Sequence, residues 1–248
     1  MEEMRDEIDL LVIIPAHNEE ESVRMVIGQV RESVPQAGIL VVDDGSSDGT
    51  AVVATEEGVF VVSLLHNLGI GAAVQTGYIF AVEKGYEVAV RVDGDGQHDP
   101  ADIPLLVSAL LEGEADVVVG SRFLTEQGLQ TSLARRLGIV ILARLIALVT
   151  GQSVTDPTSG FQSTGPDATR FLAKEYPHDY PEPEGGVLLR QAGFKVKEVP
   201  VSMSPRLGGQ SSITPVHSLY YMAKVTLAIL VGLLRKPPQR SREDDAKG

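Results

Sequence analysis

Two acidic turns stand out among the residues that could do chemistry. Asp43 and Asp44 follow a short apolar run, and Asp93 and Asp95 follow a later one. Carboxylates are hard oxygen ligands suited to Mg²⁺ or Mn²⁺, and a cation held in this way can bridge substrate phosphates. One Asp-x-Asp alone is more often an ordinary turn. Because a third run ends at Ser121-Arg122, the accumulation of such turns favours a site for a nucleotide diphosphate.

The elements that must position these turns alternate between strands and helices. Short runs rich in Val and Ile predict strands, of which 8–14 and 39–42 are expected to be buried, and apolar residues at helical spacing predict the helices between them. Strands are expected at 8–14, 39–42, 59–63, 88–92, 117–119 and 194–201, and helices after Asn18 and near 51–57, 70–84, 100–110, 133–149 and 216–234. Asn18 is expected to cap the first helix, Gly85 to end the third, and Pro177, Pro181 and Pro183 to mark a loop. Such repeated units predict an α/β fold whose mostly parallel sheet binds ligands at the carboxyl ends of its strands.

Composition narrows the classes of function. The chain has 248 residues, and its 21 Lys and Arg against 34 Asp and Glu give a net charge of −13, which disfavours a nucleic-acid partner. There are no cysteines, so disulfides and cysteine-ligated metals are excluded. The N-terminus is acidic, unlike a secretory signal, so we expect a cytoplasmic protein. Such a protein could also bind at the cytoplasmic face of the membrane.

Two other motifs suggest alternative functions. Gly45-Ser46-Ser47-Asp48-Gly49 fits the nucleophile elbow G-x-S-x-G, so a serine hydrolase using Ser47 stays an alternative. Against it, no glycine cluster for an oxyanion hole follows an early strand, and Asp93 and Asp95 would have no role. Gly69-Ile70-Gly71 begins a dinucleotide fingerprint, but Val74 stands where the third glycine should be.

Taken together, the motifs resemble glycosyltransferase family 2, with its GT-A fold. They are Ile14-Pro15-Ala16-His17-Asn18-Glu19, Val41-Val42-Asp43-Asp44-Gly45-Ser46, Asn67-Leu68-Gly69-Ile70-Gly71, Asp93-Gly94-Asp95-Gly96-Gln97-His98 and Gly120-Ser121-Arg122. Three later motifs resemble its dolichyl-phosphate mannose synthase branch: Asp156-Pro157-Thr158-Ser159-Gly160-Phe161, Glu198-Val199-Pro200-Val201 and Arg206-Leu207-Gly208-Gly209-Gln210-Ser211. The resemblance implies an inverting, metal-dependent transfer of a hexose from a nucleotide sugar, of the GDP-mannose or UDP-glucose type, to a polyprenyl or dolichyl phosphate. A non-catalytic protein that binds a nucleotide sugar is the alternative from another class.

The resemblance also implies roles for single residues. The nucleotide-sugar site would comprise Pro15, His17, Glu19, Val42, Asp44, Asp93, Gly94, Arg206, Ser211 and Ser212. The Mg²⁺ or Mn²⁺ ligands would be Asp93, Asp95 and Gln97. The acceptor phosphate would meet Arg122, with Arg135 or Arg136, and the catalytic residues would be Asp95, Arg122 and Arg206. Many relatives have Tyr where this chain has His17, and mannose synthases usually have Lys where it has Ser212, so the base preference and the GDP-mannose assignment stay open.

The last third of the chain points to the acceptor. The resemblance implies a GT-A domain over 1–212. The residue pattern predicts an amphipathic or apolar C-terminal helix over 213–235, and the composition predicts a disordered tail over 236–248. The apolar helices 133–149 and 216–234 are expected either to contact the membrane surface or to pack on each other or in a dimer. A lipid phosphate is already ionised and needs no strong base. A hydroxyl acceptor would need one, for which Glu184 is the candidate.

Overall fold

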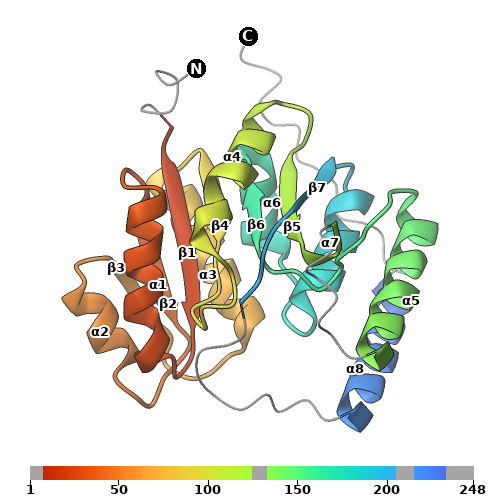
Figure 1. The fold of residues 1–248 in the computed structure, drawn as a ribbon, viewed down its shortest axis with the longest axis horizontal. Helices are drawn as coiled ribbons and strands as arrows, with labels where there is room; N and C mark the ends of the chain where they lie inside the picture. Colours follow the sequence, from red (N-terminus) through yellow and green to blue (C-terminus); the bar gives the residue numbers. More distant parts are fainter. Residues whose placement is uncertain (1–7, 125–132, 205–214, 233–248) are drawn as a thin grey trace.

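The computed structural model describes residues 8–124, 133–204 and 215–232, and for 133–135 and 215–223 it describes the backbone alone. In these residues a central sheet of seven strands has the order β3-β2-β1-β4-β6-β5-β7 (Figure 1). The strands are β1 (Leu10–Ala16), β2 (Gly38–Asp43), β3 (Phe60–Ser63), β4 (Val88–Arg91), β5 (Val117–Ser121), β6 (Gln162–Thr164) and β7 (Val196–Pro200). All pairs are parallel except those that β6 makes with β4 and β5. The predicted α/β fold with a mostly parallel sheet is confirmed.

Helices cover both faces of the sheet (Figure 1). They are α1 (Glu20–Ser33), α2 (Thr50–Glu56), α3 (Ile70–Lys84), α4 (Ile103–Leu111), α5 (Leu133–Thr150), α6 (Pro166–Glu175), α7 (Pro181–Gln191) and α8 (Pro215–Gly232), with short 3₁₀ turns η1 (Pro100–Asp102) and η2 (Arg122–Leu124). Alternate side chains of β1 enter two cores: Val12 and Ile14 pack with α1 and α4, whereas Leu11 and Ile13 pack with α3 and α6. A strand buried on both faces has no polar alternation, which is why its sequence is a continuous apolar run.

Local signals account for most helix boundaries, but two expectations were wrong. Gly85 ends α3 in the left-handed conformation, as predicted. Asn18 does not cap α1: Glu19 is the N-cap residue, and Asn18 has a φ of 55°. The expected proline loop becomes α7 from Pro181 onwards, because proline is well tolerated in a first helical turn, where backbone N–H groups lack intrahelical partners.

A third cluster joins α5, α7 and α8. Leu142 and Ile146 of α5 pack against Val187 of α7 and against Val225 and Ile229 of α8. The two long helices lie side by side at the end of the sheet away from β3 (Figure 1). None of the helices in the described part of the chain is both long and apolar enough to cross a membrane.

Candidate active site

The two acidic turns meet at the carboxyl end of β1. The amide of Gly94 donates to the Pro15 carbonyl at 3.2 Å, and the amide of Asp44 donates to the Ala16 carbonyl at 2.9 Å. Ser22 of α1 adds a third link, since its hydroxyl lies 2.8 Å from the Gly94 carbonyl oxygen. Parallel strands thus deliver the two turns to one edge of the sheet, as the sequence predicts.

Asp44 is buried, and both of its carboxylate oxygens accept backbone hydrogen bonds. Oδ1 accepts from the amide of Leu68 at 2.7 Å, and Oδ2 accepts from that of Gly69 at 2.9 Å. Gly69 has a φ of 92°, which a residue with a Cβ rarely adopts. Asp44 therefore fixes the loop that leads into α3. His17, which is exposed, donates from Nδ1 to the Asp44 carbonyl oxygen at 2.8 Å.

Other predicted members of the nucleotide pocket surround this turn. The Glu19 carboxylate lies 3.0 Å from the Ser22 hydroxyl, which places it beside Gly94. Pro15 is buried at the end of β1. Val42 is fully buried in the core that the sheet shares with α3, so its side chain packs under the pocket and does not line its open side. Ser47 is exposed, and its hydroxyl contacts the Asn18 side-chain oxygen at 3.2 Å, an amide that cannot act as a general base.

A buried arginine lies beneath the second acidic turn. Arg91, whose side chain is 2% exposed, donates to Asp93 Oδ1 from Nε at 3.0 Å and to Glu182 Oε1 from Nη2 at 2.9 Å. Its Nη1 donates to the Tyr176 hydroxyl at 3.2 Å. Burial opposes the charge on the guanidinium, but the two carboxylates outweigh it, so the pKa of Arg91 lies well above the ordinary value.

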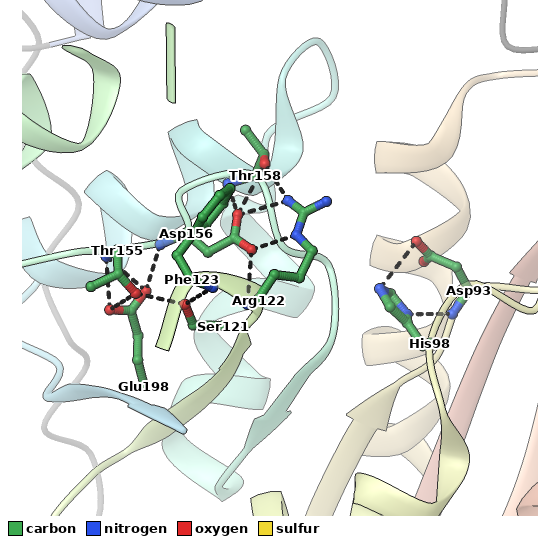
Figure 2. Close-up of polar contacts among 9 residues, drawn as sticks. All are labelled: Asp93, His98, Ser121, Arg122, Phe123, Thr155, Asp156, Thr158 and Glu198. Atoms are coloured by element: carbon green, nitrogen blue, oxygen red, sulfur yellow. Dashed lines mark hydrogen bonds and ion pairs between the residues drawn. The ribbon is translucent and has the colours of Figure 1, made fainter. Parts of the chain in front are cut away.

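His98 contacts both the backbone and the side chain of Asp93 in the same turn (Figure 2). Its Nδ1 accepts the backbone N–H of Asp93 at 3.0 Å, and its ring stacks on Phe161 with 5.0 Å between the ring centroids. Burial lowers the pKa of His98 to about 4, so the ring is neutral near pH 7. Because Nδ1 accepts, the ring proton sits on Nε2, which lies 3.8 Å from Asp93 Oδ2.

The turn fits a divalent cation that shares its coordination with a ligand. Asp95 is buried at 9% exposure, and its Oδ1 accepts the amide of Gln97 at 3.0 Å. No group of three His, Cys, Asp or Glu residues in the described ranges converges as a metal site. Mg²⁺ in phosphate-binding sites uses one or two carboxylates and completes its shell with water and substrate phosphates. The donor set of Asp93, Asp95 and Gln97 therefore suits a cation bound together with a diphosphate.

Arg122 is held by a network around Asp156 (Figure 2). Its Nε and Nη2 donate to the two Asp156 carboxylate oxygens at 2.6 and 2.8 Å, and Nη2 also donates to the Thr158 hydroxyl at 2.7 Å. Burial opposes its charge, but Asp156 raises the pKa of Arg122 above the ordinary value. Glu198 of β7 anchors this turn, because its carboxylate accepts the amides of Thr155 and Asp156. The guanidinium is thus oriented and largely neutralised before any substrate binds.

The remaining predicted residues are placed apart from this cluster or not described. Arg136 is exposed on α5. Glu184 is half-buried in the first turn of α7, and Glu182, two residues earlier, pairs with Arg91 of β4. The side chain of Arg135 and residues Arg206, Ser211 and Ser212, like the tail 236–248, lie outside the described residues.

Sequence reasoning missed the partners of these arginines. Arg91 gave a signal, since it is a lone charge in the otherwise apolar run 88–92. Glu182 gave none, because it belongs to a proline-rich segment and reaches Arg91 only through the fold. Asp156 and Glu198 were recognised as parts of motifs, but their task of holding Arg122 and its turn is visible only in the contacts.

Comparison with known proteins points to one family. Residues 11–178 match the family described as glycosyl transferase family 2. The polyprenol monophosphomannose synthase of Mycolicibacterium smegmatis is 31% identical over 228 residues, which cover 87% of this chain and 84% of that protein. The undecaprenyl-phosphate mannosyltransferase of Micrococcus luteus is 32% identical over 218 residues, which cover 83% and 87%.

A solved structure agrees on the fold. The glucosyl-3-phosphoglycerate synthase of Mycobacterium tuberculosis, in complex with Mn²⁺, uridine-diphosphate-glucose and phosphoglyceric acid, superposes with a TM-score of 0.70. The match covers 94% of this chain and 82% of that chain at 21% identity. At this identity the likeness establishes the architecture and leaves substrates to other arguments.

Proposed function

Because the chain belongs to glycosyl transferase family 2 and is a glycosyltransferase with the GT-A fold, we propose that it transfers a hexose from a nucleotide sugar to a polyprenyl or dolichyl phosphate. The observation that carries the proposal is the packing of the Asp93–Asp95 turn against the end of β1, beside Asp44. Relatives named as polyprenol-phosphate and undecaprenyl-phosphate mannosyltransferases support the acceptor class. The donor is proposed to be of the GDP-mannose or UDP-glucose type.

The donor site follows from the acidic edge. We assign the nucleotide to the surroundings of Asp44, with contributions from Pro15, His17, Glu19, Val42 and Gly94 and, from the part of the chain not described, Arg206, Ser211 and Ser212. Asp95, with Asp93 and Gln97, would hold Mg²⁺ or Mn²⁺. When bound, this cation would stabilise the negative charge that develops on the departing nucleotide diphosphate. The carboxylates orient the donor, and in-line attack at the sugar carbon inverts its configuration.

The acceptor site is assigned to the Arg122 side of the edge. A lipid phosphate is ionised at neutral pH, so it attacks without a strong base and needs only to be positioned. The Arg122 guanidinium, oriented by Asp156 and Thr158, supplies that positioning, together with Arg135 or Arg136 of α5. Glu184 would matter only for a hydroxyl acceptor, whose proton must be removed.

The exposed faces of α5 and α8 suit a lipid acceptor. Both helices carry apolar side chains that the core does not cover, namely Leu137, Val140, Ile141, Leu148, Leu227, Leu230 and Val231. Apolar helix faces with cations nearby can lie in a membrane interface without spanning it. We therefore propose peripheral contact with the cytoplasmic face of a membrane. Sedimentation with liposomes should carry the wild type down and leave Leu148→Glu, which is 84% exposed in the wild type, in the supernatant.

One assay tests the transferase proposal. The purified full chain is incubated with a panel of GDP- and UDP-sugars, Mn²⁺ or Mg²⁺ and polyprenyl phosphate, and released nucleotide and lipid-linked sugar are measured. Product is expected with one donor, and Asp95→Asn should abolish it while Ser47→Ala retains it. Full turnover with every divalent metal chelated would exclude the metal role. Transfer to soluble hydroxyl acceptors alone would replace the lipid phosphate by a hydroxyl and make Glu184 the residue to study.

A further inference from the structure

Arg91 is buried between carboxylates that come from two different parts of the chain. Asp93 belongs to the acidic turn, and Glu182 belongs to the first turn of α7. Asp93 and Glu182 are 28% and 17% exposed in their side chains, whereas Arg91 is 2% exposed. A buried ion pair of this kind is rarely more stable than apolar side chains of the same volume. We therefore look for the role of Arg91 in the groups whose positions it fixes, not in a gain of stability.

The surroundings leave the guanidinium little freedom. A Cβ added at Gly160 would lie 2.6 Å from Arg91 Cζ, so the glycine provides the space that the guanidinium fills. Tyr176, which accepts from Arg91, packs edge-on against Tyr78 with 5.5 Å between the ring centroids. The Tyr78 hydroxyl in turn accepts from Gln162 Nε2 at 2.7 Å. Arg91 is thus fixed by β4, β6, the turn before β6 and the segment that leads into α7.

We propose that Arg91 is a positioning residue for the donor site, which fixes the Asp93 carboxylate beside Asp95 and fastens the start of α7 to the acidic turn through Glu182. The inference rests on the proposed function, because it assigns Arg91 to the site for metal and nucleotide diphosphate. Arg91 touches neither substrate nor metal. Through its hydrogen bonds to Asp93 and Glu182 it holds the Asp93 carboxylate in one place beside Asp95, where a cation and a diphosphate would meet.

The test compares Arg91→Met, Arg91→Lys and Glu182→Gln with a matched control, Arg190→Met. Arg190 lies on α7 and is 7% exposed, but its Nη1 donates to the Gly186 carbonyl of its own helix. Binding of UDP and of GDP, each with MnCl₂, is measured by calorimetry without acceptor, and urea unfolding is measured in parallel. Losing a residue that orients metal ligands typically weakens metal affinity by about 10- to 100-fold.

We expect Arg91→Met to weaken binding of the Mn²⁺-nucleotide by at least about tenfold. Arg91→Lys should lie in between, because an ammonium can meet one carboxylate but not both. Glu182→Gln, at the edge of the network, should weaken binding less than Arg91→Met and still fold. Arg190→Met, which removes a buried guanidinium away from the acidic turn, should bind as the wild type does.

Two results would overturn the inference while leaving the proposed function intact. One is wild-type affinity in folded Arg91→Met or, should that variant not fold, in Glu182→Gln. The other is an equal loss of affinity in Arg190→Met, which would show that removal of any buried arginine has the same effect. A wild-type chain that binds neither nucleotide with Mn²⁺ would instead overturn the proposed function, and this inference with it.

Discussion

Replacing Asp156 by asparagine should destabilise the folded protein strongly. The Asp156 side chain is 0% exposed and accepts from Arg122 at 2.6 and 2.8 Å and from the Thr158 hydroxyl at 3.0 Å. Asparagine keeps the volume but removes the charge, so a buried guanidinium loses its counterion. Removing one partner of a buried pair costs about 3–5 kcal/mol. Since the Arg122 side chain is 15% exposed, some solvent screening remains, and we expect a loss of about 3 kcal/mol.

Urea unfolding of the two proteins measures this loss. The control is Glu56→Gln, which removes one of the two carboxylate partners of Arg24. The side chains of Glu56 and Arg24 are 60% and 53% exposed, so this change should cost less than about 1 kcal/mol. In the transfer assay, Asp156→Asn should also raise the KM for the lipid phosphate, because Arg122 is no longer oriented. If Asp156→Asn loses no more stability than Glu56→Gln, the argument that Asp156 is the counterion of Arg122 is wrong.

Two further predictions concern the folded protein without metal. The pKa of His98 is lowered by burial from 6.5 to about 4, so below pH 6.5 the unfolded chain takes up a proton that the folded chain refuses. Stability should therefore fall as the pH drops from 6.5 to about 4, and His98→Gln should remove about 3 kcal/mol of that fall in urea titrations; an unchanged slope would contradict it. A Cβ at Gly77 of α3 would lie 2.3 Å from Ile13 Cγ2, so Gly77→Ala should lower the free energy of unfolding by about 1–3 kcal/mol. Gly28→Ala in α1, where nothing lies within 4 Å, should raise it by about 0.5–1 kcal/mol, and the same sign for both would refute the packing argument.

The sequence predicts most of the sheet because buried parallel strands are continuous runs of Val and Ile. The order in which these runs alternate with helical patterns is enough to predict the α/β class. β6 escaped prediction because Gln162, Ser163 and Thr164 carry no apolar signal, although all three are buried. Their polar groups find partners inside the fold: the Ser163 hydroxyl donates to the Leu106 carbonyl, and Thr164 bonds Thr169. Such partners depend on tertiary contacts that no local pattern shows.

The candidate site, too, could be predicted from the sequence only in part. Asp93 and Asp44 could be predicted to converge, because the carboxyl ends of parallel strands share one edge of the sheet. The expected cap at Asn18 was wrong for a tertiary reason: its side-chain oxygen accepts the amide of Ser47 at 2.8 Å, 29 positions along the chain. The pairing of Arg91 with Glu182 is of the same kind. Residue types along the chain predict where charged side chains are concentrated. Which of these side chains form ion pairs depends on segments that are distant in the sequence.

This pairing of charges has a consequence for the reaction. The proposed donor, a nucleotide diphospho-sugar, would bring negative charge to an edge that already carries Asp44, Asp93 and Asp95. Arg91 lies at the start of the Asp93 turn and Arg122 at the end of β5, and each is already paired with a carboxylate. Neither guanidinium therefore has its full charge to offer a second anion, since that charge is shared with its present partner. The electrostatics of this edge thus favour a divalent cation, which would offset the repulsion between the donor's diphosphate and the acidic turn. Acidic side chains such as Asp95 are the ligands that such a cation needs.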